Sequence, residues 1–144
     1  MLADFLTMHE SSHKPYDQIA YTFVGDCRFN MGRSLLVMGA LMGSDVRLAG
    51  PAELHSPKDV TDIAADIAGR TGARITITED PAQAVAGVDF IHTDVWVSMG
   101  ESKDVWTERV KLLAPYQVNA SLIVSDQAAN RLHTIKAVLV ATLG

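Results

Sequence analysis

The sequence predicts an α/β fold, a Rossmann-like doubly wound parallel sheet of about five strands with helices on both faces. Short apolar runs rich in β-branched residues alternate along the chain with longer segments of helical periodicity. Most of these runs are followed by glycine, proline or aspartate, which typically end regular structure. Strands separated by helices pair in parallel, because the crossover helices cover both faces of the sheet.

The elements follow one another at regular spacing. Five segments have the composition of buried strands: 19–24, 46–49, 74–78, 88–92 and 121–124. Helical patterns occupy the intervals: 31–42, 59–70, a short turn at 83–85, 104–113 and 127–143. No repeat or internal linker interrupts the pattern, so we expect one domain covering residues 1–144.

Composition and charge exclude several classes of partner. The chain has 12 Lys and Arg against 17 Asp and Glu, a formal charge of −5, which argues against nucleic acid and against an anionic membrane surface. No apolar stretch approaches the roughly 18 residues that span a bilayer, and the acidic N-terminus does not resemble a secretion signal. With Cys27 as the only cysteine, the chain is predicted to be cytoplasmic.

A first candidate loop, GDCRFNMGRS, follows the first predicted strand. Asn30 is a plausible N-cap or N1 residue of the next helix, whose exposed amides would accept an anion such as a carboxylate. Gly25 and Gly32 match neither the dinucleotide fingerprint nor a P-loop, so no nucleotide cofactor is predicted. The alternative is an ordinary strand-to-helix turn.

A second candidate loop, TDVWVSMGES, follows the fourth predicted strand. Asp94 could pair with an ammonium group, and the hydroxyl of Ser98 could share that group. Trp96 and Met99 could enclose the aliphatic part of a ligand, which indicates a site for a small molecule bearing an amine. The alternative is that Asp94 caps local amides while Trp96 packs inward.

Neither a metal nor a nucleophilic cysteine is predicted. His9 and His13 are spaced as metal ligands on a helix can be, but no cysteine or carboxylate pattern completes a site. Cys27 is interpreted as a small buried side chain.

The segment DVWVSMGE, from Asp94 to Glu101, resembles the ornithine-binding signature of the ornithine carbamoyltransferases. The related aspartate carbamoyltransferases do not use this Ser-Met-Gly loop. Other segments agree in order: LADFLTMHE, GDCRFNMGRSLL, TITEDPAQAVAGVDFIHTDVW, ERVKLLAPYQVN and DQAANRLHTIKAVLVATL. The resemblance implies transfer of a carbamoyl group from carbamoyl phosphate to the δ-amino group of ornithine, giving citrulline and phosphate, in arginine biosynthesis or the urea cycle.

The same resemblance implies a role for individual residues. Asn30 would hold the α-carboxylate of L-ornithine, while Asp94 and Ser98 would hold its α-ammonium group. The backbone at Met99 would also contact the ligand. Arg131 would reach carbamoyl phosphate as the catalytic arginine, through charge-assisted hydrogen bonds.

Departures from the family pattern limit what we expect of this chain. The carbamoyl phosphate domain and a His-Cys-Leu-Pro segment, which the family has between YQVN and DQAANR, are absent from this sequence, and Phe29 and Arg33 replace polar residues of the first loop. We therefore expect an ornithine-binding domain that is inactive alone, a monomer or a weak dimer through its uncovered inter-domain face. The alternatives are an excised or engineered scaffold that has lost ligand binding, and a partner that completes an active site with a separate carbamoyl phosphate domain.

Overall fold

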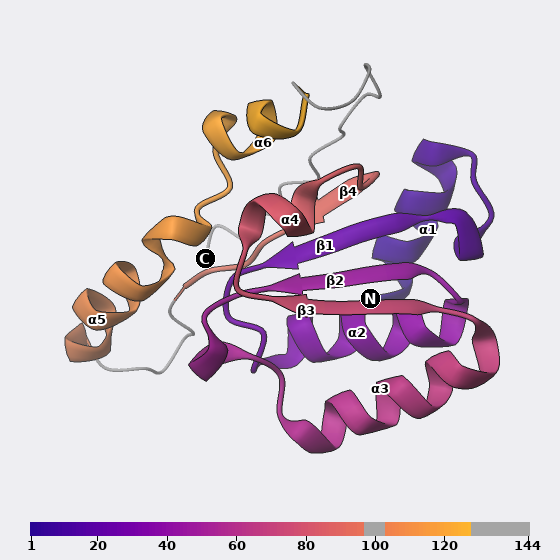
Figure 1. The fold of residues 1–144 in the computed structure, drawn as a ribbon, viewed down its shortest axis with the longest axis horizontal. Coiled ribbons are helices and arrows are strands. Elements are labelled where there is room, and N and C mark those ends of the chain that lie inside the picture. The colour runs from indigo at the N-terminus through magenta and orange to yellow at the C-terminus, as the bar shows by residue number, and fades with distance from the viewer. Residues whose placement is uncertain (97–102, 128–144) are drawn as a thin grey trace.

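A parallel sheet of four strands forms the centre of the computed structural model, which describes residues 1–96 and 103–127 (Figure 1). The strands are β1 (Ala20–Val24), β2 (Asp45–Ala49), β3 (Arg74–Thr78) and β4 (Phe90–His92). Their order is β3-β2-β1-β4, and every pairing is parallel. The chain therefore winds outward from β1 to β3 and returns to the other side of β1, which confirms the α/β, doubly wound prediction with about four strands instead of five.

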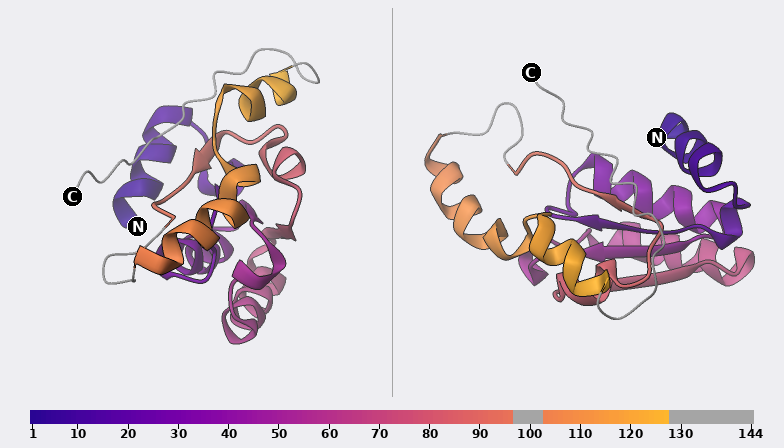
Figure 2. Two further views of the ribbon diagram at one scale, coloured as in Figure 1. Left: turned by 90° about the vertical axis from the view of Figure 1, so that its left-hand side faces the viewer. Right: turned by 90° about the horizontal axis from the view of Figure 1, so that it is seen from above.

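Helices cover both faces of this sheet. They are α1 (Leu2–Ser12), α2 (Asn30–Met42), α3 (Lys58–Thr71), α4 (Pro81–Val85), α5 (Lys103–Leu113) and α6 (Ala120–Gln127), with short 3₁₀ turns η1 (Tyr16–Gln18), η2 (Ala52–Leu54) and η3 (Ala114–Tyr116). Figure 2 shows α2 on one side of the sheet and α5 and α6 on the other. Among the described residues, no helix is both long and apolar enough to cross a membrane.

The core is divided by the sheet into two apolar clusters, because successive side chains of a strand point to opposite faces. Tyr21 and Phe23 of β1 contribute to the cluster beneath α1, α2 and α3. Val24 of the same strand and Ile91 of β4 contribute to the cluster beneath α4, η3 and α6. Burial of both clusters removes apolar surface from water and is the main force that holds the layers together.

The predicted fifth strand, 121–124, is wrong, because this segment lies in α6. Asn119 begins the helix: its side-chain Oδ1 accepts a hydrogen bond from the backbone N–H of Leu122 at 3.0 Å. Leu122 and Ile123 then pack against the second cluster. A β-branched run this short fits a helix as well as a strand, and here the preceding cap and the apolar face next to α4 favour the helix. Beyond Gln127, which ends α6, the predicted helix 127–143 lies outside the described residues.

Candidate functional site

The two loops singled out in the sequence leave adjacent strands at the same edge of the sheet. Phe23 of β1 is paired with His92 of β4, so the two strands end at the same level. The strand order reverses between β1 and β4, and the crevice outside the carboxyl ends at such a point is where doubly wound sheets bind ligands. The loops that carry Asn30 and Asp94 therefore begin side by side at this edge.

The turn 25–29, between β1 and α2, is tied to the segment that follows β2. The backbone N–H of Cys27 donates to the carbonyl of Leu54 at 2.9 Å, and the hydroxyl of Ser56 donates to the carbonyl of Cys27 at 2.7 Å. On the other side, a Cβ at Gly32 would lie 2.8 Å from the Cα of Cys27, closer than side chains normally approach a backbone. Only glycine at this position lets α2 begin so close to the turn.

Asp26 is the electrostatic centre of the turn. Its carboxylate accepts hydrogen bonds from the backbone N–H of Arg28 at 3.1 Å and from Nε and Nη2 of the same arginine at 3.0 and 2.8 Å. It also forms a buried ion pair with Nη1 of Arg109, which comes from α5. The side chains of Asp26 and Arg109 are only 4% and 10% exposed.

Sequence reasoning missed this cluster. The Asp-x-Arg spacing in the turn was a usable signal, because residues two apart in a turn often bond to each other. Nothing local points to Arg109, which is more than eighty positions away and sits in an otherwise amphipathic helix.

Cys27 is a packing residue, as the sequence indicated. Its thiol is buried and faces the carbonyls of Gly25 and Ala49, at 3.6 and 3.9 Å. Burial, and then the negative charge of Asp26, raise the pKa of Cys27 to about 12. The thiolate that a nucleophile requires is therefore suppressed.

Asn30 is the first residue of α2, the N1 position, and its side chain is exposed at the rim of the site. Phe29 occupies the N-cap position and makes no side-chain cap. Its ring lies beneath the guanidinium group of Arg28, with 5.4 Å between the guanidinium carbon and the ring centroid. The opening amides of α2 thus have no side-chain acceptor among the described residues, and a carboxylate could approach them.

Asp94 is half-buried two residues beyond β4. Its Oδ1 accepts a hydrogen bond from the backbone N–H of Val95 at 2.8 Å, and in the part of the chain that the structure describes its carboxylate makes no other hydrogen bond. Trp96 packs partly against the second apolar cluster. The local-capping alternative is therefore partly realised, because Asp94 accepts a hydrogen bond from a neighbouring amide. Ser98, Met99 and Arg131, the other predicted site residues, lie outside the described residues.

His92, at the end of β4, belongs to the core beneath α1. Its Nε2 lies 3.4 Å from the sulfur of Met8, and its ring meets Tyr21 edge to face with 5.7 Å between centroids. Burial lowers the pKa of His92, although the nearby charge of Asp4 opposes this effect. The ring is therefore neutral at physiological pH.

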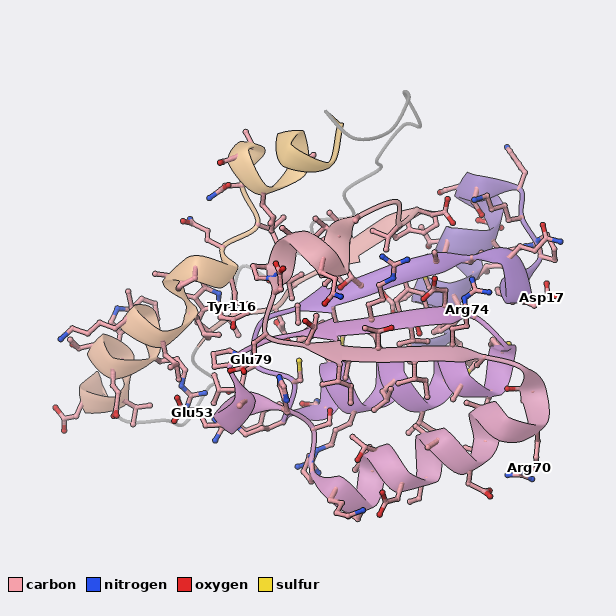
Figure 3. All side chains as sticks on the ribbon, in the orientation of Figure 1. Asp17, Glu53, Arg70, Arg74, Glu79 and Tyr116 are labelled. Carbon is pink, nitrogen blue, oxygen red and sulfur yellow. The ribbon has the colours of Figure 1, made fainter. Side chains whose placement is uncertain are left out.

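A pocket of about 460 Å³ lies between η2 and α5, beyond the carboxyl ends of the strands. It is lined by Arg28, Glu53, Leu54, Val105, Glu108, Arg109, Lys111 and Leu112. Directly after α5, the hydroxyl of Tyr116 in η3 donates to the carbonyl of Glu79 at 2.8 Å (Figure 3). This bond ties the C-terminal end of α5 to the residue that follows β3. Arg109 thus lines this pocket and pairs with Asp26 of the turn that precedes Asn30.

The described residues contain no group of three or more His, Cys, Asp and Glu placed to hold a metal. His13 has left-handed backbone geometry (φ 56°) just after α1, and His9 bonds through Nδ1 to the carbonyl of Lys14 at 2.7 Å. The two histidines therefore do not share a helix face.

A family model described as the Asp/Orn binding domain of aspartate/ornithine carbamoyltransferase matches residues 17–125. The chain belongs to the aspartate/ornithine carbamoyltransferase family. The match includes the sheet, the turn 25–29 and the whole of α5, so the site described above lies within the part that defines this carbamoyltransferase domain.

Relatives of known name agree with this assignment. The chain is 44% identical to a catabolic ornithine carbamoyltransferase of Chromobacterium violaceum and 43% identical to one of Rhizobium meliloti. In both comparisons the whole chain is aligned with 58% of the relative's length. Its fold is similar to the ornithine carbamoyltransferase of Pyrococcus furiosus, with a TM-score of 0.78 and 34% identity over 86% of this chain and 39% of that one.

The alignment with the relative from Chromobacterium violaceum covers 196 positions, whereas the chain has 144 residues, all of them aligned. The relative therefore contains residues inside the aligned region that this carbamoyltransferase chain lacks. An internal shortening of this kind agrees with the absence of the His-Cys-Leu-Pro segment from the sequence.

Proposed function

We propose that this chain is an L-ornithine-binding domain that does not transfer a carbamoyl group by itself. The observation that carries the proposal is that the signature segment beginning at Asp94 leaves β4 beside the turn that leads to Asn30, at the switch point of a carbamoyltransferase domain. The site would recognise the two oppositely charged α-groups of the amino acid. The α-carboxylate would face the open amides of α2 and the side chain of Asn30, and the α-ammonium group would face Asp94.

The family description allows aspartate as well as ornithine as the ligand. Asp94 favours ornithine over aspartate, because the α-ammonium group that it attracts is common to both, whereas the side-chain carboxylate of aspartate would be repelled. Ser98 and Met99 would complete the contacts to the amino acid, and Arg131 would contact carbamoyl phosphate in a complete enzyme. These three roles rest on the sequence resemblance. The relatives named above are described as catabolic, so they lend no support to the biosynthetic direction.

Catalytic inactivity is proposed from the residues that the relative has inside the aligned region and this chain lacks. Transfer requires the amine to be held against the carbamoyl carbon, and most of the rate advantage comes from that placement. Within the aligned region, the chain lacks residues that the relative from Chromobacterium violaceum has, and with them part of what could hold the two substrates together. We expect no citrulline above a buffer control when the purified chain is given carbamoyl phosphate and L-ornithine, and citrulline formation would contradict this part of the proposal.

Calorimetric titration with L-ornithine tests binding. We expect a Kd of about 1 mM or tighter, lost in Asp94→Ala, no heat with L-aspartate, and comparable binding of L-norvaline, which has the same α-groups without the δ-amine. Asp104→Ala, a change at an exposed aspartate of α5, is the matched control and should bind like the parent chain. Binding of L-aspartate in place of L-ornithine would reverse the assigned specificity.

Two observations favour the alternative, a scaffold that has lost ligand binding. Phe29 brings an apolar ring to the mouth of the turn, and one oxygen of Asp94 is already occupied by a neighbouring amide. For a well-folded chain, the absence of both heat and thermal shift with L-ornithine would establish this alternative.

The oligomeric state is also a proposal, a monomer or a weak dimer. Leu2 and Leu6 of α1 are exposed large apolar side chains and would lie on the uncovered face. Sedimentation velocity over a range of concentrations distinguishes these states from a stable trimer, which would contradict the proposal.

A further inference from the structure

We propose that Asp26 and Arg109 are positioning residues of the amino-acid site, and that their buried ion pair holds the turn 25–29, and with it Asn30, against α5. The effect on ligand affinity rests on the proposed function. The effect on the turn itself does not, and it can be measured without a ligand.

The pair lies where the turn meets α5. The turn's backbone bonds through Cys27 run to the segment 54–56 after β2. Toward α5, Asp26 of the turn forms the ion pair with Arg109. Figure 1 shows α5 beyond the carboxyl ends of the strands, and its last residues, Leu112 and Leu113, pack in the second apolar cluster. The ion pair therefore joins two elements that the sheet does not join.

The carboxylate of Asp26 organises the turn from inside as well. It accepts from both the backbone N–H and the guanidinium group of Arg28, which closes the local turn, and from Arg109, which fixes its orientation. The first residue of α2, Asn30, follows Asp26 by four positions. A change in the direction of Asp26 is thus transmitted through a short, hydrogen-bonded stretch to the residue that would meet the ligand's carboxylate.

Burial makes the loss of one partner costly. With Asp26 and Arg109 at 4% and 10% exposure, removal of the Arg109 cation leaves a carboxylate short of a partner in a poorly solvated place. Opening of the turn to water relieves this cost. We therefore expect local opening, because neither Asp26 nor Arg109 belongs to a strand or to either apolar cluster.

Cys27 is a built-in probe of that opening. It is the only cysteine of the chain, it lies between Asp26 and Arg28, and its thiol is fully buried. A thiol reagent such as 5,5′-dithiobis(2-nitrobenzoate) can reach it only when the turn opens or the whole domain unfolds. The labelling rate under native conditions therefore reports turn opening.

The test compares Arg109→Met, Asp26→Asn and the parent chain. We expect both variants to be labelled at least about tenfold faster, with a rate that depends only weakly on urea, as local opening requires. The two changes alter the charge beside the thiol in opposite senses: loss of Asp26 favours the thiolate and loss of Arg109 disfavours it. Faster labelling of Arg109→Met therefore cannot be an electrostatic effect on the thiol, and this variant still decides the matter if Asp26→Asn fails to fold.

Matched controls come from the other end of the sheet. Arg74→Met removes an arginine from a second aspartate, Asp45, far from the turn, and should leave the labelling rate within about twofold. Arg109→Lys retains the cation and should recover most of the parent rate. Labelling of Arg109→Met at the parent rate, or only through a steeply urea-dependent global unfolding, would overturn the proposal.

L-ornithine titrations separate this inference from the proposed function. If the parent chain binds, Arg109→Met should bind about tenfold more weakly at a temperature where it is fully folded, and Arg109→Lys should bind like the parent. Unchanged affinity with a loosened turn would overturn the positioning role. If the parent chain does not bind, the proposed function fails, while the labelling comparison still decides whether the ion pair holds the turn.

Discussion

Two Asp-x-Arg segments, 26–28 and 45–47, lie at opposite edges of the same sheet. In each, the aspartate accepts from the arginine two positions later and from a distant arginine, Arg109 at the carboxyl edge and Arg74 at the amino edge. Figure 3 shows Arg74 at the amino ends of the strands, away from α5. The local sequence is the same, but the surroundings are not.

Burial separates the two clusters. The side chain of Arg109 is 10% exposed, whereas that of Arg74 is 70% exposed. An exposed pair is screened by water and contributes little, while a buried pair that loses one member leaves an uncompensated charge. The comparison shows that Asp-x-Arg spacing alone does not indicate how strong an ion-pair cluster is. The burial of the distant arginine, Arg109 or Arg74, decides whether the cluster holds neighbouring elements together.

The largest effect is expected when the buried cluster is broken. Arg109→Met should lower the free energy of unfolding by about 3 kcal/mol, the lower end for a buried pair, because Arg28 still contacts Asp26. Urea denaturation followed by tryptophan fluorescence measures the change. A loss no greater than that of Arg74→Met would remove the distinction between the two edges.

A second prediction concerns the packing of the same turn. Gly32→Ala would place a Cβ 2.8 Å from the Cα of Cys27, and the backbone cannot yield easily, so we expect a loss of about 1–3 kcal/mol in the free energy of unfolding. Gly69→Ala in α3 is the matched control: nothing lies within 4 Å, and the change should stabilise the helix by up to about 1 kcal/mol. Effects of the same sign in the two variants would contradict the close approach of α2 to the turn.

A third prediction uses the buried histidine at the carboxyl edge. The pKa of His92 is lowered in the folded chain by burial, so the unfolded chain binds a proton first as the pH falls. The stability that neutral His92 contributes is present above its unfolded pKa, near 6.5, and is lost as the pH falls below it. In thermal melts between pH 7.5 and 5, the Tm of His92→Gln should therefore fall less with decreasing pH than the Tm of the parent chain. Equal slopes would indicate that His92 keeps its ordinary pKa.

The smallest effect is expected at the amino edge. Arg74→Met should change the free energy of unfolding by less than about 1 kcal/mol, because Arg74 is largely exposed and Arg47 continues to pair with Asp45. Raising the salt concentration should change the stability of the parent and of Arg74→Met almost equally. A loss of several kcal/mol would show that the exposed pair matters as much as the buried one.

Local patterns identified most of the fold and predicted the loops of the candidate site. The runs 19–24, 46–49 and 74–78 are strands close to their predicted bounds, and the helix predicted at 59–70 is α3, which ends at Gly72 in the left-handed region. These predictions are confirmed because hydrophobic periodicity and turn residues determine structure within a few positions along the chain. The segment 121–124 fails for the same reason: its composition suits two structures, and the cap at Asn119 and the space beside α4 select the helix.

The sequence by itself determined the α/β class and the two loops that follow β1 and β4, and it predicted Asn30 and Asp94 as ligand-binding residues, since each depends on local pattern or on a resemblance carried by contiguous motifs. Only the tertiary structure brought Arg109 to Asp26 and left Arg74 in solvent. The physical reason is that charge pairing depends on distance and burial in space, which sequence separation does not encode. The sequence specifies which charged side chains are present. The packing of α5 beyond the sheet decides which of them are buried together beside the candidate site.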